Sequence, residues 1–474
     1  MKEVQKIDAM RRKVRCIHFV GIGGIGMSGI AEVLINLGYA VSGSDLNPTE
    51  ITHRLVSLGA VINSGHRADN IGQADVVVTS TAVRQDNPEV MEAHTRGIPV
   101  IPRAEMLAEL LKMKFSIAVS GSHGKTTTTS MISTVLAQGK LDPTMVIGGK
   151  LSSIGSNAKI GDGEIIVAEA DESDRSFLKL SPTVAVITNI DLEHLDHYRD
   201  IEDIKEAFLQ FANIVPFYGS TVLCIDNEHA QDILPMIKRK TITYGLTGMA
   251  EYRADRISFA GGMTSFDLYH KNRFLGSVQL NVPGLFNVYN AMATIAVARE
   301  IDMPFPVISE GIKMFTGVHR RLELKGAVQG LRVVDDYGHH PTEILATLAA
   351  AKQVWGEGRL IVVFQPHRYT RTKGLFREFL TCFKDADILI VMDIYAASEE
   401  PIEGINSQNL CEGIRQAGHP HAVYIPVAEE IVDYLQKVGK PTDTIITQGA
   451  GSVWKIGEAF LKRMEETGSD EGVR

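Results

Sequence analysis

The stretch SGSHGKTTTT, which spans Ser120–Thr129, decides how the chain is organised. It follows the apolar run Phe115–Val119, which predicts a strand, and precedes Ser130–Gln138, which predicts a helix. A strand, a loop of small residues ending in Gly-Lys-Thr and a helix form a phosphate cradle, because loop amides and the helix N-terminus point at the anion. Lys125 adds a mobile positive charge, and Thr126 offers its hydroxyl to the Mg²⁺ that accompanies the phosphates. The stretch therefore predicts an ATP site.

This loop is a tighter variant of the usual pattern G-x-x-x-x-G-K-[ST]. Val119 stands in the place of the first glycine, and the nearest glycine is Gly121. A bare GKT is also compatible with an ordinary glycine-rich turn, but the flanking strand and helix favour a nucleotide site. The predicted ATP-binding residues of the loop are Gly121, Ser122, His123, Gly124, Lys125, Thr126 and Thr127.

Length and composition indicate a large globular protein. The 474 residues correspond to about three domains. The chain is 44% hydrophobic and 22% charged, which provides enough core material for each domain. The net charge of −9 disfavours nucleic acid as the main partner, because binding a phosphate backbone usually needs a basic face.

The cysteines and the N-terminal segment bear on the compartment. The 4 cysteines lie far apart without a C-x-x-C pair, which argues against a disulfide framework or a structural zinc site. The N-terminal segment is heavily charged, and the apolar stretch after it is interrupted by glycines and Glu32, so neither a signal peptide nor a membrane span is predicted. We expect a cytoplasmic protein without a membrane partner, present as a monomer or a weak homodimer.

Residues 1–112 predict a first domain with a Rossmann-like parallel sheet. The segment CIHFVGIGGIGMSGIAEVLINLGYAVSGSD reads as strand, glycine turn, helix and strand, and its Gly21, Gly23 and Gly26 satisfy G-x-G-x-x-G. Asp45 follows where an acid usually binds a ribose hydroxyl. This pattern suits NAD in a dehydrogenase. The separate phosphate loop at Ser120 favours a second reading, in which the turn holds the pyrophosphate of a UDP-sugar.

Further strands of the first domain are predicted at Ala60–Asn63, Val76–Ser80 and Pro99–Ile101. His66 and Ser80 fall near strand ends, where ligands of open parallel sheets bind. Each of them, taken singly, could also be an ordinary loop residue.

Residues 113–316 predict a central P-loop-type α/β domain. The run EIIVAEADESD predicts a buried strand that ends near Glu169, and TVAVITNIDLEHLDHY predicts another that ends near His194. A carboxylate at such a strand end can hold the Mg²⁺ that bridges the β- and γ-phosphates, so Glu169 and His194 are the predicted metal ligands beside Thr126. In NVPGLFNVYNAMATIAVARE, Asn287 and Asn290 suit an adenine edge, although they could be plain helix caps.

Residues 317–474 predict a third, doubly wound Rossmann-like domain, because strands and helices alternate again from Leu331 onward. Basic and aromatic residues gather in three segments that follow predicted strands or lead into them, VHRRLE, DDYGHHPTE and QPHRYTRT. Arginines at such positions suit the capture of a carboxylate or a phosphate through paired hydrogen bonds. The segments contribute Arg320, Arg321, Asp336, Tyr337, His339, His340, His367, Arg368 and Arg371.

The chain resembles the Mur ligases of bacterial cell-wall synthesis nearly from end to end. The resemblance is carried by GIGGIGMSGIAEVL, SGSHGKTTTT, EADESD, TNIDLEHLDHY, GLFNVYNA, DDYGHHPTE, QPHRYTRT and QGAGS. The first of these blocks, with DDYGHHPTE and QPHRYTRT, is most similar to the alanine-adding members. The resemblance implies three α/β domains and the ATP- and Mg²⁺-dependent joining of L-alanine to UDP-N-acetylmuramate. The alternative within the family is a recycling ligase that adds a tripeptide to the same sugar nucleotide.

The resemblance also implies roles for single residues. Arg321 would reach the ATP phosphates, Asp336 would bind the ATP ribose, and Asn287 or Asn290 would meet adenine. The implied UDP-sugar site comprises Gly21, Gly23, Gly24 and Gly26 with Asp45, and His66 and Ser80 join it from their strand-end positions. The implied alanine pocket comprises Tyr337, His339, His367, Arg368 and Arg371. The expected catalytic residues are Lys125, Glu169, His194, Arg321, His339, His367 and Arg371.

One position departs from the family pattern. The family usually has the pattern G-x-H-N at positions 284–287, which end with Asn287. This chain has Phe286 in place of the histidine. The protein therefore manages without that histidine or stacks the phenyl ring on adenine.

The expected chemistry is an activation followed by a transfer. The lactyl carboxylate would attack the ATP γ-phosphate to form an acyl phosphate, with Lys125 and Mg²⁺ offsetting the charge. The alanine amine, deprotonated near His194 or a histidine of the last domain, would then expel phosphate. Two other classes stay open at this point: an NAD-dependent dehydrogenase, and a regulatory module that binds ATP without carboxylate-dependent ADP release.

Overall fold

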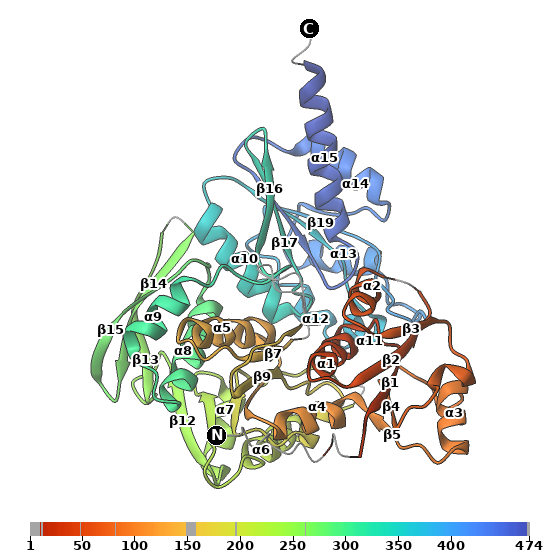
Figure 1. Ribbon diagram of the computed structural model, residues 1–474. Helices are drawn as coiled ribbons and strands as arrows, with labels where there is room; N and C mark the ends of the chain where they lie inside the picture. The colour runs from red at the N-terminus through yellow and green to blue at the C-terminus, as the bar shows by residue number, and fades with distance from the viewer. Residues whose placement is uncertain are drawn as a thin grey trace. The chain divides into compact units, whose positions relative to one another are not determined.

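The computed structural model describes residues 10, 13–47, 49–80, 82–147, 158–194, 197–260 and 262–471 (Figure 1). The described chain divides into two compact units. The first takes in the described chain up to Asp255 together with Asp267–Val278 and Tyr289–Phe315. The second takes in the described parts of Arg256–Phe266, Gln279–Val288 and Thr316 onward. The α/β class is confirmed by mainly parallel sheets covered by helices.

The N-terminal sheet has the strand order β3-β2-β1-β4-β5 and is parallel throughout. The predicted strands are confirmed to within two residues at each end. The reversal of strand order on either side of β1 places the glycine turn, which follows β1, at the carboxyl edge where nucleotides bind such sheets. The elements are β1 (Cys16–Val20), α1 (Ile25–Asn36), β2 (Ala40–Asp45), α2 (Glu50–Ser57), β3 (Val61–Ser64), η1 (Ala68–Ile71), β4 (Val76–Thr79), α3 (Pro88–Thr95), β5 (Val100–Pro102) and α4 (Arg103–Lys112).

A second sheet has the order β15-β14-β13-β12-β11-β10-β6-β9-β7-β8. Its centre is parallel, with β6 between β10 and β9, so the loop after β6 emerges beside the ends of both neighbours. The strands are β6 (Phe115–Ser120), β7 (Thr144–Val146), β8 (Ala158–Lys159), β9 (Ile165–Glu169), β10 (Val184–Ile187), β11 (Ser220–Cys224), β12 (Lys240–Gly245), β13 (Tyr252–Ala260), β14 (Met263–His270) and β15 (Arg273–Leu280). The helices are α5 (Lys125–Gln138), η2 (Ser176–Lys179), α6 (Ile201–Asn213), α7 (Glu228–Ile233), η3 (Leu234–Met236), α8 (Leu285–Glu300) and α9 (Phe305–Lys313).

Helix α5 begins at Lys125, five residues before the predicted helical stretch. Threonines have low helix propensity, so Thr126–Thr129 gave no local helix signal. In the structure these threonines are half-buried or buried at the start of α5, and tertiary packing outweighs propensity. The phosphate loop is therefore as short as Gly121–Gly124.

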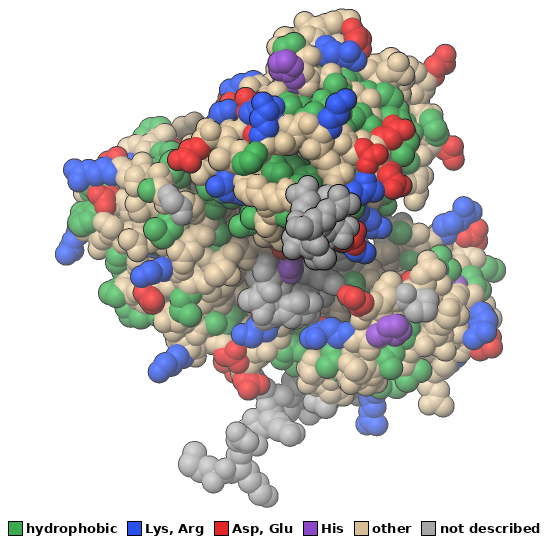
Figure 2. Space-filling view, turned by 90° about the horizontal axis from the view of Figure 1, so that it is seen from above, with side chains coloured by type: hydrophobic (Ala, Val, Ile, Leu, Met, Phe, Trp, Pro, Cys, Tyr) green, Lys and Arg blue, Asp and Glu red, His purple; other side chains and the backbone are tan. Residues whose placement is uncertain are grey.

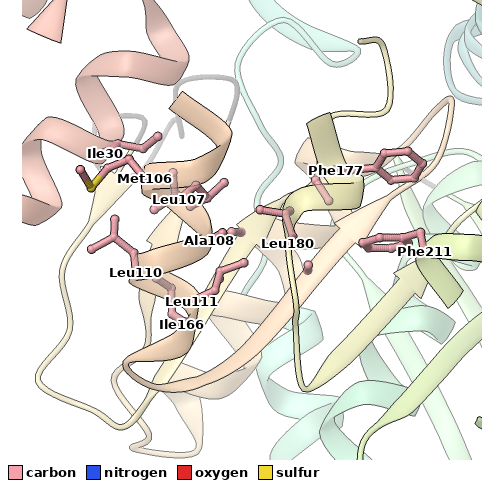
Figure 3. Close-up of a cluster of buried hydrophobic side chains, with 14 of the residues drawn as sticks. Ile30, Met106, Leu107, Ala108, Leu110, Leu111, Ile166, Phe177, Leu180 and Phe211 are labelled. Atoms are coloured by element: carbon pink, nitrogen blue, oxygen red, sulfur yellow. The ribbon is translucent and has the colours of Figure 1, made fainter. Parts of the chain in front are cut away.

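Helix α4 joins the first two predicted domains through one apolar core. Its Met106, Leu107, Leu110 and Leu111 are each at most 5% exposed and point in different directions around the helix (Figure 3). They belong to the same buried cluster as Ile30 of α1, Ile166 of β9 and Leu180. A helix that is apolar around most of its circumference is buried on several sides. The division at 1–112, 113–316 and 317–474 stays a prediction, since the first segment and most of the second lie in one compact unit.

The third sheet has the order β16-β17-β21-β18-β19-β20 and is parallel except for the β16–β17 hairpin. Alternate residues of its strands enter two separate buried clusters: Val362 and Phe364 pack with α10, α12 and α13, whereas Ile361 and Val363 pack with α14 and α15. This alternation confirms the doubly wound prediction, since helices cover both faces. The elements are β16 (Glu323–Val328), β17 (Leu331–Asp336), α10 (Pro341–Trp355), β18 (Leu360–Phe364), α11 (Tyr369–Gly374), α12 (Phe376–Phe379), β19 (Ile388–Val391), α13 (Ser407–Gln416), β20 (Ala422–Tyr424), α14 (Ala428–Val438), β21 (Thr444–Gln448) and α15 (Trp454–Glu471).

The surface carries charges of both signs. On the face seen in Figure 2, acidic and basic side chains are interspersed among polar and apolar ones. Within the described residues, no helix combines the length and the apolar character needed to cross a bilayer.

Candidate active site

The phosphate loop between β6 and α5 has a backbone that only glycine can adopt at two positions. Gly121 has φ +134°, and a Cβ there would lie 2.0 Å from Thr188 Oγ1. Gly124 has φ +84°, and its Cβ would lie 2.7 Å from Asn290 Oδ1. Both φ values lie outside the range that L side chains favour, so the glycines are required for conformation as well as for space.

Hydrogen bonds to the end of β10 hold the loop in shape. The His123 amide donates to Asn189 Oδ1 at 2.8 Å, and Thr188 Oγ1 donates to the His123 carbonyl at 2.6 Å. The Asp191 amide donates to Ser122 Oγ at 2.8 Å. The first amides of α5 have no partner within the helix, so a preformed anion site results.

Lys125 is held inside this loop by three acceptors. Its Nζ donates to the carbonyls of Gly121 at 2.6 Å and Ser122 at 3.2 Å, and to Glu172 Oε1 at 2.7 Å. Burial by itself lowers the pKa of Lys125, but the carboxylates around it, Glu172 foremost, outweigh burial and raise the pKa above its ordinary value. The ammonium is therefore charged at neutral pH.

A group of three side chains capable of holding a cation lies beside Lys125. Glu172, Glu193 and His194 each offer one ligand atom, and these atoms lie within 4.8 Å of one another. Glu172 is 2% exposed, and its Oε2 has no hydrogen-bond partner among the described residues. A buried carboxylate oxygen without a donor, next to a second carboxylate and an imidazole, fits the oxygen-rich coordination that Mg²⁺ requires.

Of the predicted metal ligands, His194 belongs to this group of three. Thr126 lies in the first turn of α5, and His194 Nε2 lies 3.5 Å from Glu172 Oε1. Glu169 ends β9, where it pairs in register with Val119 of β6. The geometry adds Glu172 and Glu193 as candidate ligands. Several acidic residues follow each strand in the sequence, and the sequence alone did not show which of them lie close together. Glu169 is not part of the compact group of three.

The two asparagines expected at adenine lie on α8. Asn290 Oδ1 accepts a hydrogen bond from Thr128 Oγ1 at 3.0 Å, which ties α8 to the helix behind the phosphate loop. Asn287 Nδ2 donates to the Pro283 carbonyl at 2.6 Å, and its side chain is buried. Phe286 packs on the apolar cluster of the C-terminal sheet, which accounts for a phenyl ring at that position. Their adenine contacts stay predictions.

The glycine turn of the N-terminal sheet is held by the end of β2. The amides of Gly21 and Ile22 donate to the Ser44 carbonyl at 2.8 and 3.0 Å, and the Gly23 amide donates to Asp45 Oδ2 at 2.8 Å. Asp45 thus supports the turn itself, and Gly24 precedes α1 as its N-cap. His66 follows β3 and Ser80 follows β4, so both lie at the carboxyl edge with the turn, as predicted.

Arg103 was not identified from the sequence. A Cβ at Gly26 would lie 3.0 Å from Arg103 Nη1, and Arg103 Nη2 donates to Asp171 Oδ2 at 2.6 Å. Burial raises the pKa of Asp171, but the hydrogen bond from Ser173 and the charges of Arg103 and Lys125 lower it to about 2. One cation thus connects the glycine turn to the acidic loop. The sequence did contain one indication of this role: Arg103 directly follows the strand that ends in Ile-Pro, and it begins the next helix.

In the second unit, the residues of the predicted alanine pocket form a cluster. The His339 and His367 rings lie 5.5 Å apart between centroids, and Tyr337 meets His339 edge-on at the same distance. Arg371 Nη1 lies 3.1 Å from His367 Nδ1. Arg368 is turned toward Glu399, with Nε 4.0 Å from its Oε1. The cluster combines neutral rings with a guanidinium, a combination that suits a small zwitterion.

Both histidines of this cluster are held neutral. Burial, with the charges of Arg371 and Arg368, lowers the pKa of His367 to about 4. Burial also holds the pKa of His339 well below its ordinary value, against the opposite effect of Glu343. At neutral pH both rings are therefore uncharged.

Arg321 and Asp336 are engaged within the second unit. Arg321 Nη1 lies 3.4 Å from Glu343 Oε1, and its guanidinium lies 5.3 Å from the Tyr337 ring centroid. The Asp336 carboxylate accepts hydrogen bonds from the amides of Leu322 and Gly338 and from the side chains of Thr347 and Gln448. It is 4% exposed. A ribose contact by Asp336 stays a prediction that would require exchanging some of these bonds.

Comparison with known proteins covers the whole described fold. Three family models match in succession: the Mur ligase family catalytic domain at residues 16–115, the Mur ligase middle domain at 119–298, and the Mur ligase glutamate ligase domain at 320–451. The UDP-N-acetylmuramate–L-alanine ligase of Syntrophus aciditrophicus is 68% identical over 466 residues, which cover 98% of this chain and 97% of the relative. That of Geobacter sulfurreducens is 57% identical over 458 residues, covering 96% and 99%.

A solved structure gives the same result. The crystal structure of a UDP-N-acetylmuramate–alanine ligase from Thermotoga maritima superposes with a TM-score of 0.80 at 30% sequence identity. The alignment covers 95% of this chain and 99% of that one.

Proposed function

The chain belongs to the Mur ligase family, and from this premise we propose that it joins L-alanine to the lactyl carboxylate of UDP-N-acetylmuramate at the expense of ATP. The products are the amide, ADP and phosphate, and the reaction supplies a precursor of peptidoglycan. The observation that carries this conclusion is the 68% identity to an alanine-adding ligase across 98% of the chain. The phosphate loop, with its partly buried and charged Lys125, agrees with an ATP-driven reaction.

The activation step uses the first unit. The lactyl carboxylate attacks the γ-phosphate, and an acyl phosphate forms as ADP leaves. Lys125 exchanges its carboxylate partner for phosphate oxygens and offsets the charge on the transferring group. Thr126, Glu169 and His194, together with Glu172 and Glu193, would hold Mg²⁺, which supplies further charge neutralisation when bound.

The sugar nucleotide is assigned to the N-terminal sheet. Amides of the glycine turn and the N-terminus of α1 offer donors to a pyrophosphate, and Gly21 has φ +76°, a conformation that glycine adopts readily. Arg103 lies against Gly26 at the same turn, so a positive charge is present where the pyrophosphate would bind. Asp45, His66 and Ser80 complete the proposed site.

The transfer step needs an uncharged amine. Alanine in water carries an ammonium group, which is no nucleophile, so a proton acceptor must remove its proton. His339 and His367 are both neutral at pH 7, and Arg371, beside His367, can pair with the alanine carboxylate. Attack on the acyl carbon then gives a tetrahedral intermediate that expels phosphate.

One assay tests this function. ADP release is followed with UDP-N-acetylmuramate, L-alanine, ATP and Mg²⁺ together, and then with each omitted in turn. We expect full activity only with all four. Replacing L-alanine by the tripeptide tests the recycling ligase, and a tripeptide preference would overturn the alanine assignment. Binding of NAD without ATP turnover would instead support a dehydrogenase.

The cellular setting is proposed on the same basis. We place the reaction in the cytoplasm, where ATP and sugar nucleotides are made, and propose a monomer or weak homodimer without a nucleic-acid partner. Sedimentation of the purified protein, alone and with a synthetic duplex, tests both expectations.

The partly buried His367 makes stability depend on pH. Its folded pKa is about 4, whereas a histidine in an unfolded chain titrates near about 6.5. Between these values the unfolded chain binds a proton that the folded chain does not, so stability falls as the pH is lowered through this window and returns as it rises. We therefore expect the melting temperature of the wild type to fall more between pH 7 and pH 5 than that of His367→Gln.

Thermal unfolding at several pH values measures this difference. His421→Gln is the matched control, because His421 is an exposed histidine of the same unit. The control should show the pH dependence of the wild type. Identical pH profiles for wild type and His367→Gln would contradict the neutral state of His367.

A further inference from the structure

A completely buried carboxylate lies on a helix that flanks the N-terminal sheet. Glu89, near the start of α3, is 0% exposed. Its Oε2 accepts a hydrogen bond from Ser44 Oγ at 2.6 Å and lies 3.6 Å from His18 Nε2 and 3.5 Å from His66 Nδ1. Its Oε1 accepts from the Asn70 side chain. Burying a carboxylate costs free energy, which its hydrogen-bond partners offset only in part. An apolar side chain would fill this position at lower cost, so we expect Glu89 to have a role in addition to packing.

The partners show that Glu89 is ionised. Burial alone raises the pKa of Glu89, but its contacts with His18, Ser44 and Asn70 outweigh burial and lower the pKa to about 2. An ionised carboxylate can only accept hydrogen bonds, so the Ser44 hydroxyl must donate to it. That hydroxyl oxygen also lies 2.9 Å from His66 Nδ1. Since the Ser44 proton is already used, His66 Nδ1 must carry a proton and donate to Ser44.

These contacts fix the proton on Nδ1 of the His66 ring and leave Nε2 able to accept a hydrogen bond from a ligand. With Nδ1 protonated, the neutral His66 ring presents Nε2 as a hydrogen-bond acceptor. The side chain is 20% exposed, and Nε2 has no hydrogen-bond partner among the described residues. His18, the other histidine against Glu89, is instead fully buried and bonded through Nδ1 to Ser42.

Ser44 also positions the nucleotide turn. Its carbonyl accepts the amides of Gly21 and Ile22, so the residue that orients His66 through its side chain holds the glycine turn through its backbone. The residue before His66 is held by two hydrogen bonds, because the Gly65 amide donates to the Asp45 carbonyl and the Asn70 side chain donates to the Gly65 carbonyl. His66 is therefore held in a set position relative to the turn.

We propose that Glu89 and Ser44 are positioning residues for His66, whose Nε2 accepts a hydrogen bond from the nucleoside part of the bound sugar nucleotide. The ligand group is a donor, either a ribose hydroxyl or the uracil N–H, in contrast to the anion held by the turn. This inference rests on the proposed function, since it takes the sugar nucleotide as the ligand of this sheet. His66 contacts the ligand, whereas Glu89 and Ser44 act through it.

Ser44→Ala tests the relay with the smallest change of volume. We expect the dissociation constant for UDP-N-acetylmuramate, measured by calorimetry at pH 8, to rise about tenfold, the value of one oriented hydrogen bond. The affinity for ATP and the kcat at saturating sugar nucleotide should stay within about twofold. Nitrogen NMR of histidine-labelled protein should show the Nδ1-protonated form of His66 in the wild type and a mixture of tautomers in Ser44→Ala. Ser44→Thr retains a hydroxyl and should restore most of the affinity.

Two further variants distinguish positioning from packing. In a His66→Ala background, Ser44→Ala should add nothing to the loss, because both changes remove the same contact. Glu32→Gln is the matched control: Glu32 is a buried glutamate of helix α1 that pairs with Arg54, and its replacement should leave the affinity and the tautomer unchanged. Additive losses, an unchanged affinity in Ser44→Ala, or an unchanged tautomer would overturn the inference. A wild type that does not bind UDP-N-acetylmuramate would overturn the proposed function instead.

Discussion

Lys125→Ala lowers turnover on the order of a thousandfold while the affinity for UDP-N-acetylmuramate stays within about twofold of the wild type. The ammonium is the charge aimed at the phosphates from the loop that follows β6, and Glu172 and two backbone carbonyls hold it there before ATP arrives. Without it, negative charge on the transferring phosphoryl group is left uncompensated. We propose that the sugar nucleotide binds at the glycine turn of a different sheet, so its binding should not depend on this side chain.

The measurement combines steady-state ADP release with calorimetry of the sugar nucleotide. Lys112→Ala is the control, because Lys112 is an exposed lysine of the same unit whose partner is Glu109 one helical turn away. It should behave as the wild type in both experiments. Near-normal turnover in Lys125→Ala would refute the ATP role of the loop, and a parallel loss of sugar-nucleotide affinity would show that the two nucleotides share a site.

Glu172→Gln is expected to lower turnover on the order of a hundredfold. The carboxylate accepts from Lys125 through Oε1, and its buried Oε2 lacks a hydrogen-bond partner among the described residues. An amide of the same size removes the negative charge and brings an NH₂ group toward Lys125 or toward the cation site. Binding of ATP without a divalent ion should not weaken, since Lys125 is then released toward the phosphates. Binding of Mn²⁺ to the complex with a nonhydrolysable ATP analogue should weaken about tenfold.

Electron paramagnetic resonance of Mn²⁺ and ADP release together check this prediction. Glu202→Gln is the control, because Glu202 is a 74%-exposed carboxylate of the same unit that pairs with Lys205. Glu169→Gln is measured in parallel. Comparing it with Glu172→Gln shows whether the carboxylate predicted from the sequence, Glu169, or the one that contacts Lys125, Glu172, has the larger effect on turnover and Mn²⁺ binding. Turnover within about threefold of the wild type in Glu172→Gln, with unchanged Mn²⁺ binding, would rule out a role for Glu172 at the phosphates.

The motifs in the sequence were sufficient to place the phosphate loop, the glycine turn and the alternating third domain. These features depend on local rules: the periodicity of apolar residues, and glycines where the backbone needs φ above zero. The same local rules misjudged the start of α5, because threonines have low helix propensity, whereas packing of α5 against α9 and β9 holds the segment helical. Phe286 could not be interpreted either, since its partner is an apolar cluster of residues distant in sequence.

The sequence by itself determined the family, the chemistry and the residues with recognisable spacing, Lys125 above all. Only the tertiary structure decided which side chains meet. Glu172 lies 47 positions after Lys125 and reaches it because β6 and β9 pair in parallel. Arg103 and Asp171 are 68 positions apart, and Ser44 and Glu89 are 45 positions apart. Such contacts follow from strand register and loop packing, which act through space, whereas a sequence pattern reports only on neighbours along the chain.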